Sequence, residues 1–167
     1  LDIYRGKLKP TRDPAAFLAY VAFFPQLVAG PIERATNLLP QFLSTRTLTY
    51  HKTEKGLWLI VWGLFKKVVI ANNLAPLVDM VYGHDSASGL IIILATLAFA
   101  LQIYCDFSAY SDIAIGTARL FGIDLIRNFA YPYFSQSMSE FWRRWHISLS
   151  TWFRDYVYVP LGGKHVS

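Results

Sequence analysis

The stretch from residue 139 to 156 holds the densest set of side chains that could do chemistry. It lies in a run from 139 to 158 that predicts one helix, ended by a proline and two glycines. On that helix a broad aromatic face would form at three- and four-residue spacing, made by Trp142, Trp145, Leu149, Trp152 and Phe153. His146 would lie along the edge of that face, four residues from Trp142 and from Ser150. Indole rings lower the local dielectric and favour the neutral imidazole, which suits a general base or a hydrogen-bond donor to an oxygen.

The same pattern also has a purely structural interpretation. Helices rich in Trp and Arg are typical of the aromatic belt at a membrane interface, where a histidine is only a polar filler. Glu140 and Arg144 are four residues apart and can pair on a helix surface. Composition alone favours the belt, so the residues leave both interpretations of His146 open.

A second polar segment, residues 102–112, follows an apolar run directly and contains two carboxylates, several hydroxyls and an amide. Ionisable groups at such depth usually face the interior of a helix bundle or a water-filled cavity. Asp106, Tyr110 and Asp112 could therefore line a substrate path, or the carboxylates could pair with arginines, among them Arg119, Arg143 and Arg144. Asp112 could equally be an acid in the first turn of a new helix, favoured by the helix dipole.

The sequence offers little support for other catalytic centres. Cys105 is the only cysteine, so no disulfide and no cysteine zinc site can form within the chain. The other histidines, His51, His84 and His165, are expected to be exposed in loops, and no histidine pair has metal-ligand spacing with a carboxylate nearby. Residue order assigns no Ser-His-Asp triad. We therefore expect neither a metal site nor a bound cofactor.

The composition favours a membrane environment. Hydrophobic residues make up 54% of the 167 residues and charged residues only 16%, against about 25% in soluble proteins. The net charge is +5, but the basic residues sit between apolar runs instead of forming a stripe. Such spacing suits loops and helix ends at an anionic membrane surface, and it argues against nucleic-acid binding.

Apolar runs predict several helices and no strands. Residues 89–104 form the clearest membrane span, followed by a second helix over 111–121 that ends at Gly122. A long helix is predicted from near Thr53 to Tyr82, and shorter ones over 14–28 and around 38–43. No sustained alternation supports β-barrel strands. The predicted fold class is an all-α, multi-helix integral membrane protein.

Lys66 and Lys67 interrupt the predicted helix over 53–82. A charged side chain at the bilayer centre is costly, so such lysines either snorkel to the headgroups or face a polar interior. We expect both ammonium groups to reach water or headgroup phosphates, with a weak preference for the cytoplasmic side.

Four stretches of the chain resemble one protein family. They are Phe-Pro-Gln-Leu-Val-Ala-Gly-Pro-Ile-Glu-Arg (24–34), Gly-Leu-Phe-Lys-Lys-Val-Val-Ile-Ala (63–71), Tyr-Cys-Asp-Phe-Ser-Ala-Tyr-Ser-Asp-Ile-Ala-Ile-Gly (104–116) and Phe-Trp-Arg-Arg-Trp-His-Ile-Ser-Leu-Ser-Thr-Trp-Phe-Arg-Asp-Tyr (141–156). In this order they are similar to the membrane-bound O-acyltransferases, particularly the branch that acetylates alginate and, more distantly, the D-alanyl-transfer proteins of teichoic-acid modification.

The resemblance implies a bundle of membrane helices around a funnel, of which residues 1–167 would be the central part of a single domain, truncated at both ends. It places a functional histidine at His146 and the family's invariant histidine beyond Ser167, so the chain alone is expected to be inactive. Asp106, Tyr110, Asp112, Trp142, Arg143, Arg144, Trp145 and Ser150 are predicted to line the substrate path or support it.

The implied activity is transfer of an acyl group, expected to be acetyl, to hydroxyls of an extracytoplasmic polysaccharide such as alginate or a cell-wall polymer. The donor would be acetyl-CoA or another acyl thioester. The partners would be the lipid bilayer, the polysaccharide and other proteins of an acylation pathway. The implied location is the bacterial inner membrane, as a multi-pass protein. A transporter or channel segment, or a structural membrane subunit without a site, remains an alternative.

Overall fold

The computed structural model describes residues 2–84 and 87–163, and in this part of the chain every regular element is helical. The predicted all-α class is confirmed. The α-helices are α1 (Pro14–Val21), α2 (Ala35–Leu43), α3 (Tyr50–Leu64), α4 (Asn72–Tyr82), α5 (Gly89–Leu120), α6 (Met138–Arg144) and α7 (Ile147–Phe153). Short 3₁₀ turns cover Phe24–Gln26 and Pro132–Phe134, and π-helical segments cover Phe65–Ala71 and Arg154–Tyr158.

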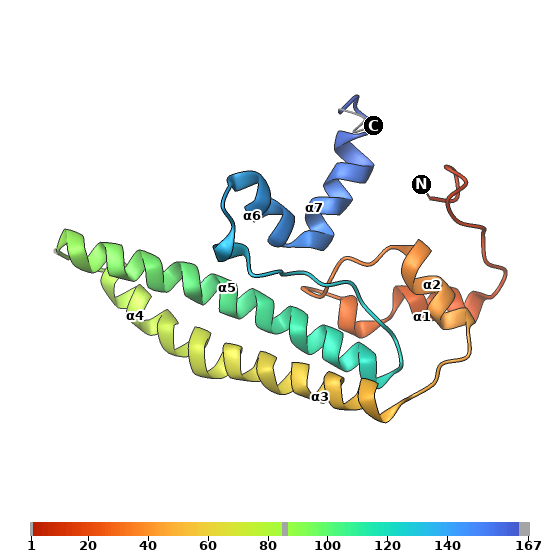
Figure 1. The fold of residues 1–167 in the computed structure, drawn as a ribbon, viewed down its shortest axis with the longest axis horizontal. Helices are drawn as coiled ribbons and strands as arrows, with labels where there is room; N and C mark the ends of the chain where they lie inside the picture. The colour runs from red at the N-terminus through yellow and green to blue at the C-terminus, as the bar shows by residue number, and fades with distance from the viewer. Residues whose placement is uncertain (1, 85–86, 164–167) are drawn as a thin grey trace.

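Two long helices dominate the molecule. The first is α3, the π-helical segment and α4, which run without a break from Tyr50 to Tyr82 and lie alongside α5 (Figure 1). They contain 33 and 32 residues, and both are apolar. At 1.5 Å per residue, each is long enough to cross a hydrocarbon core of about 30 Å. The first helix starts slightly earlier than predicted, because the Thr49 side chain accepts a hydrogen bond from the Lys52 N–H as its N-cap.

The prediction of two helices between residues 89 and 121 was wrong, because α5 is continuous. Residues 102–112 contain no glycine or proline that would end a helix. The helix ends where predicted, with Gly122 in the left-handed region at φ 73°. Asp112 therefore lies well inside a helix, and the first-turn interpretation of this residue was also wrong.

Glycines allow α3 and α5 to pack backbone against backbone. A methyl group added at Gly116 would lie 2.5 Å from the Gly56 carbonyl oxygen. One added at Gly63 would lie 2.7 Å from the Ala109 carbonyl oxygen. Small residues at such contacts are the usual way for membrane helices to approach closely.

Replacing Gly116 with alanine should therefore destabilise the protein by about 1–3 kcal/mol, because the added methyl group overpacks the contact between α3 and α5. Thermal unfolding of the full-length protein in detergent measures the effect. Gly89→Ala is the matched control, since a methyl group there meets nothing within 4 Å. Equal stability of the two variants would show that the helices do not need this close approach.

A smaller layer covers one end of the long pair. Helix α1 begins at Pro14 with Asp13 as its N-cap, as predicted, and the Asp13 carboxylate accepts hydrogen bonds from the N–H groups of Ala15 and Ala16. It contains only eight residues, so the apolar run over 15–28 is not a full crossing. The core that joins this layer to α5 contains Phe23, Leu38, Ile115, Ala118, Ile123 and Leu125.

An irregular segment over residues 122–131 leads from the end of α5 back towards α6 (Figure 1). Side chains from the small layer form hydrogen bonds with the backbone of this segment. Gln41 donates to the Asp124 carbonyl at 2.9 Å and accepts from the Asp124 N–H at 2.8 Å. The buried Glu33 carboxylate accepts from the Ile126 N–H. These bonds fix the path of the segment before it reaches the candidate site.

Candidate functional site around His146

The prediction of a single helix over 139–158 was wrong. Helix α6 ends at Arg144, Trp145 is extended, and α7 starts only at Ile147. Between them His146 lies in the left-handed region, at φ 44° and ψ 55°, which a residue other than glycine seldom adopts. The continuous aromatic face from Trp142 to Phe153 therefore does not exist.

The break has an identifiable cause in the segment over 122–131. In an unbroken helix, the Arg144 carbonyl would accept from the N–H of Ser148. Instead it accepts from the Ala130 N–H at 2.9 Å, and the Ile147 N–H donates to the Asn128 carbonyl at 2.9 Å. The neighbouring segment thus takes over hydrogen bonds that a continuous helix would use.

His146 lies at this junction with its ring half-buried against α5. The ring meets Phe107 edge-on, with 4.7 Å between the ring centroids. Burial lowers the pKa of His146 below its ordinary value, so the imidazole is neutral near pH 7. Within residues 2–84 and 87–163, neither ring nitrogen hydrogen-bonds to another residue. The side chain is therefore available to accept a proton from a bound molecule.

An aromatic cluster forms the wall next to His146, and Trp145 is at its centre. The Trp145 ring lies 5.1 Å from Phe129, 5.6 Å from Phe141 and 6.2 Å from Tyr104, measured between centroids. Ser150, predicted as a support residue, donates to the Trp145 carbonyl at 3.3 Å. These contacts place Trp145 and Ser150 beside His146, and their supporting roles stay a prediction.

Three more of the predicted site residues, Trp142, Arg143 and Arg144, lie on α6. Glu140 and Arg144 pair at 2.5 Å, as predicted. The Gln136 N–H, with help from Arg144, lowers the pKa of Glu140. Trp142 is 53% exposed, and the exposed Arg143 donates to the Ser139 carbonyl. Trp142 and Arg143 thus form part of the surface of the described chain.

Asp106 and Asp112 pair with lysines, so the predicted arginine partners were wrong. Lys66 is only 6% exposed and donates to Asp112 at 2.7 Å and to Ser108 at 2.8 Å. Lys67 pairs with Asp106 at 2.5 Å. The expectation that both ammonium groups reach water was wrong for Lys66, which faces a polar interior instead.

A cavity of about 550 Å³ adjoins the Lys66–Asp112 pair. Its polar lining includes Lys66, Cys105, Ser108, Asp112, Arg119 and Arg127. His146 does not line this cavity, and neither do Asp106 and Tyr110, the latter being an exposed residue of α5. The aromatic rings of Tyr104 and Phe129 belong both to the cavity wall and to the cluster around Trp145. The aromatic cluster therefore adjoins the cavity through Tyr104 and Phe129, and Phe107 connects Phe129 to the His146 ring.

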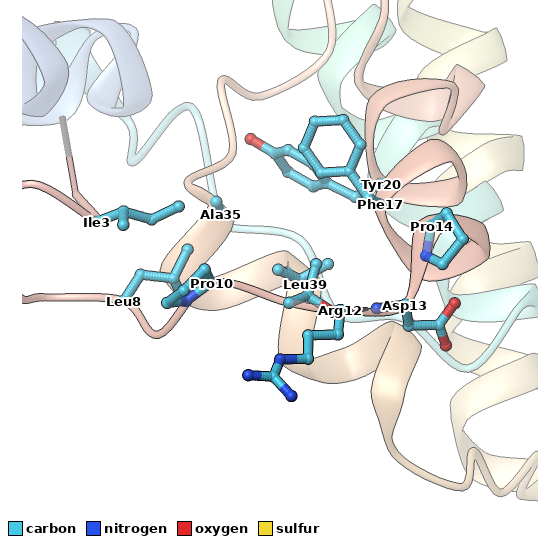
Figure 2. Close-up of a pocket in the computed structure, with 11 residues that line it drawn as sticks. Ile3, Leu8, Pro10, Arg12, Asp13, Pro14, Phe17, Tyr20, Ala35 and Leu39 are labelled. Carbon is cyan, nitrogen blue, oxygen red and sulfur yellow. Dashed lines mark hydrogen bonds between the residues drawn. The ribbon is translucent and has the colours of Figure 1, made fainter.

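A different cavity, of about 340 Å³, lies between the N-terminal segment, α1 and α2 (Figure 2). Its lining is mainly apolar, and the Asp13 carboxylate in it is already used to cap α1. Nothing in this lining suits acid–base chemistry, so we do not assign the site there.

The other histidines do not add to the site. His51 lies in the first turn of α3, so the prediction of a loop was wrong, although the residue is exposed. His84 follows α4 and is exposed, and its Nδ1 lies 2.7 Å from the Met80 carbonyl oxygen. His165 lies outside the described residues. In the part of the chain that the structure describes, no three His, Cys, Asp or Glu side chains gather as metal ligands do.

Comparison with known proteins decides the family. The family model of the membrane-bound O-acyltransferases matches residues 8–167. The chain belongs to this family. It is 47% identical to a probable alginate O-acetylase of Azotobacter vinelandii over 164 residues, which are 98% of this chain and 33% of that protein. The predicted family and the membrane environment are thereby confirmed.

Two further relatives of this chain have different names. A peptidoglycan O-acetyltransferase of Helicobacter pylori is 44% identical over 90% of this chain and 29% of its own length. A teichoic acid D-alanyltransferase of Streptococcus thermophilus is 33% identical over 87% of this chain and 37% of its own length. The chain spans about a third of the length of the curated relatives it matches.

Sequence reasoning missed two residues of the site. The role of Lys66 depends on Asp112, which is 46 positions away, and no local pattern singled out Asn128. The one available signal was the pair of lysines inside an apolar run, which indicated a polar interior as one alternative.

Proposed function

We propose that this chain forms part of a membrane-bound O-acyltransferase that moves an acetyl group from a thioester to hydroxyls of an extracytoplasmic polysaccharide. The observation that carries the proposal is the 47% identity to probable alginate O-acetylases over 98% of the chain. The acceptor class is alginate or a cell-wall polymer, and the donor is acetyl-CoA or another acyl thioester. The protein is a multi-pass protein of the bacterial inner membrane that works with other proteins of an acylation pathway.

In the proposed reaction the neutral His146 imidazole accepts the proton of the acceptor hydroxyl. The hydroxyl oxygen attacks the thioester carbonyl carbon, so a C–O bond forms and the carbonyl oxygen becomes an oxyanion. This intermediate then collapses, and the C–S bond breaks. The proton on His146 then passes to the departing sulfur, so the products are an ester and a thiol. A hydrogen-bond donor must stabilise the oxyanion in between, a role that suits the histidine predicted beyond Ser167.

The aromatic wall around Trp145 supports this assignment. Water that reached an activated acyl group would hydrolyse it, and the ring of Phe107, which packs on both His146 and Phe129, excludes water from one side of the imidazole. The same rings keep the local dielectric low, which preserves the neutral imidazole.

The test is ester formation by the full-length protein in membrane vesicles, with any pathway proteins it needs. A labelled acetyl thioester and either alginate or a cell-wall polymer are supplied. We expect alkali-labile label on one of the polysaccharides. Absence of transfer to every acceptor, with flux of an ion or solute across the vesicle membrane, would favour a transporter instead.

The rate of transfer should stay high down to a pH below the ordinary histidine pKa of about 6.5. The base works only when neutral, and burial lowers the pKa of His146, so its protonation begins at a lower pH. As the pH falls through this range, the free energy of unfolding should also decrease, because the histidine of the unfolded chain is protonated before that of the folded chain. Initial rates against pH measure the first effect. An acidic limb at or above pH 6.5 would contradict a buried base.

A further inference from the structure

Asn128 is a fully buried amide next to His146, and the reaction above gives it no role. Its exposed fraction is 0%, and it lies in the irregular segment between α5 and α6. A buried amide is costly unless its polar atoms are hydrogen-bonded, so the partners of Asn128 indicate what it holds in place.

Three of these hydrogen bonds go to the start of α7. The Asn128 carbonyl accepts from the Ile147 N–H at 2.9 Å. Its side-chain Oδ1 accepts from the Ser148 N–H at 3.3 Å and from the Ser148 hydroxyl at 2.7 Å. The first N–H groups of a helix are usually bonded by the side chain of the N-cap residue. That residue is His146, whose side chain makes no such bond, and Asn128 takes its place.

Asn128 is in turn anchored to α5. Its Nδ2 donates to the hydroxyl of Ser111 at 3.1 Å, and Ser111 is only 1% exposed. Phe107, one turn earlier on α5, supports the His146 ring. The long helix therefore controls both the backbone of His146, through Asn128, and its ring, through Phe107.

The backbone at His146 needs such support. Its left-handed conformation is sparsely populated for residues other than glycine and persists only where the surroundings determine it. The bonds from Asn128 fix Ile147 and Ser148, the two residues that directly follow His146. Without them, α6 and α7 could relax towards one continuous helix, which would turn the imidazole to a different side.

We propose that Asn128 is a positioning residue that holds His146 in its left-handed conformation and so aims the imidazole at the acceptor hydroxyl. The proposal rests on the proposed function, in which His146 moves the proton. Asn128 itself touches no reacting atom.

The test is Asn128→Ala in the full-length protein, with kcat and KM measured by ester formation. We expect kcat to fall about 10- to 100-fold, as for a base displaced by about 1 Å, while KM changes less than about threefold. In a His146→Ala background the same substitution should have no further effect, since there is then no imidazole to aim.

Two further variants keep the test decisive. Gln41→Ala is the matched control, because Gln41 also holds the backbone of the 122–131 segment through an amide, but at Asp124. It should keep kcat within about twofold. Ser111→Ala is the milder variant if Asn128→Ala does not insert into membranes. It removes the anchor of Nδ2, and its smaller loss of kcat should likewise vanish in the His146→Ala background.

Equal losses of kcat with and without His146 would overturn the positioning role, since they would show a general structural effect. So would normal kcat in Asn128→Ala, or a rise in KM alone. These results differ from failure of the proposed function, which would appear as near-normal transfer by His146→Ala itself.

Discussion

Replacing Asp112 with alanine should destabilise the full-length protein by about 3–5 kcal/mol, towards the lower end because its carboxylate is 26% exposed. The protein loses stability because the variant removes the ion-pair partner of Lys66. Lys66 is almost fully buried, so its ammonium group would lose its counter-charge and keep only Ser108 as a partner. An uncompensated buried charge costs far more than the pair itself contributes. Thermal or denaturant unfolding in detergent measures the loss.

The neighbouring ion pair supplies the control. Lys67 and Asp106 join the same two helices, but their side chains are 45% and 49% exposed. Asp106→Ala should cost only about 0–1 kcal/mol, as is usual for exposed pairs. The double variant Lys66→Met with Asp112→Leu should regain most of the stability, since it leaves no buried charge. Equal losses for the two aspartate variants would mean that Lys66 reaches water after all.

The sequence predicted the helices of this protein better than their interruptions. Asp13 as an N-cap, Gly122 as a helix end and the apolar runs depend on neighbouring residues, so local reasoning found them. The π-helical segment at Phe65–Ala71 was not predicted, and the ion pairs of Lys66 and Lys67 with α5 join residues 39 or more positions apart. No local pattern specifies such partners.

The break at His146 shows the same limit more clearly. Residues 139–158 have a helical pattern, but the Ala130 N–H and the Asn128 carbonyl compete for the hydrogen bonds at residues 144 and 147. Tertiary contacts thus override local propensity at one residue. A strained residue where local rules fail is what a functional site often shows. The residue pattern left the role of His146 open, and the resemblance to a family favoured a functional histidine there.

Replacing His146 with alanine in the full-length protein should lower acyl transfer by about a hundredfold or more, the usual loss when one acid–base group is removed. Expression and membrane insertion should be unchanged, since the half-buried ring makes no hydrogen bond within residues 2–84 and 87–163. His146→Gln should rescue little if the histidine moves a proton, and much more if it only donates a hydrogen bond. His84→Ala is the matched control and should leave the rate unchanged, because that histidine is exposed at the end of α4.

The most direct test of the central claim is therefore the rate of ester formation by His146→Ala, measured beside the wild-type protein and His84→Ala in the same membranes. A loss of about a hundredfold or more in His146→Ala alone is the predicted result. Near-normal transfer by His146→Ala would contradict the claim, and would mean that the Trp-rich segment is an interfacial aromatic belt in which His146 is a polar filler.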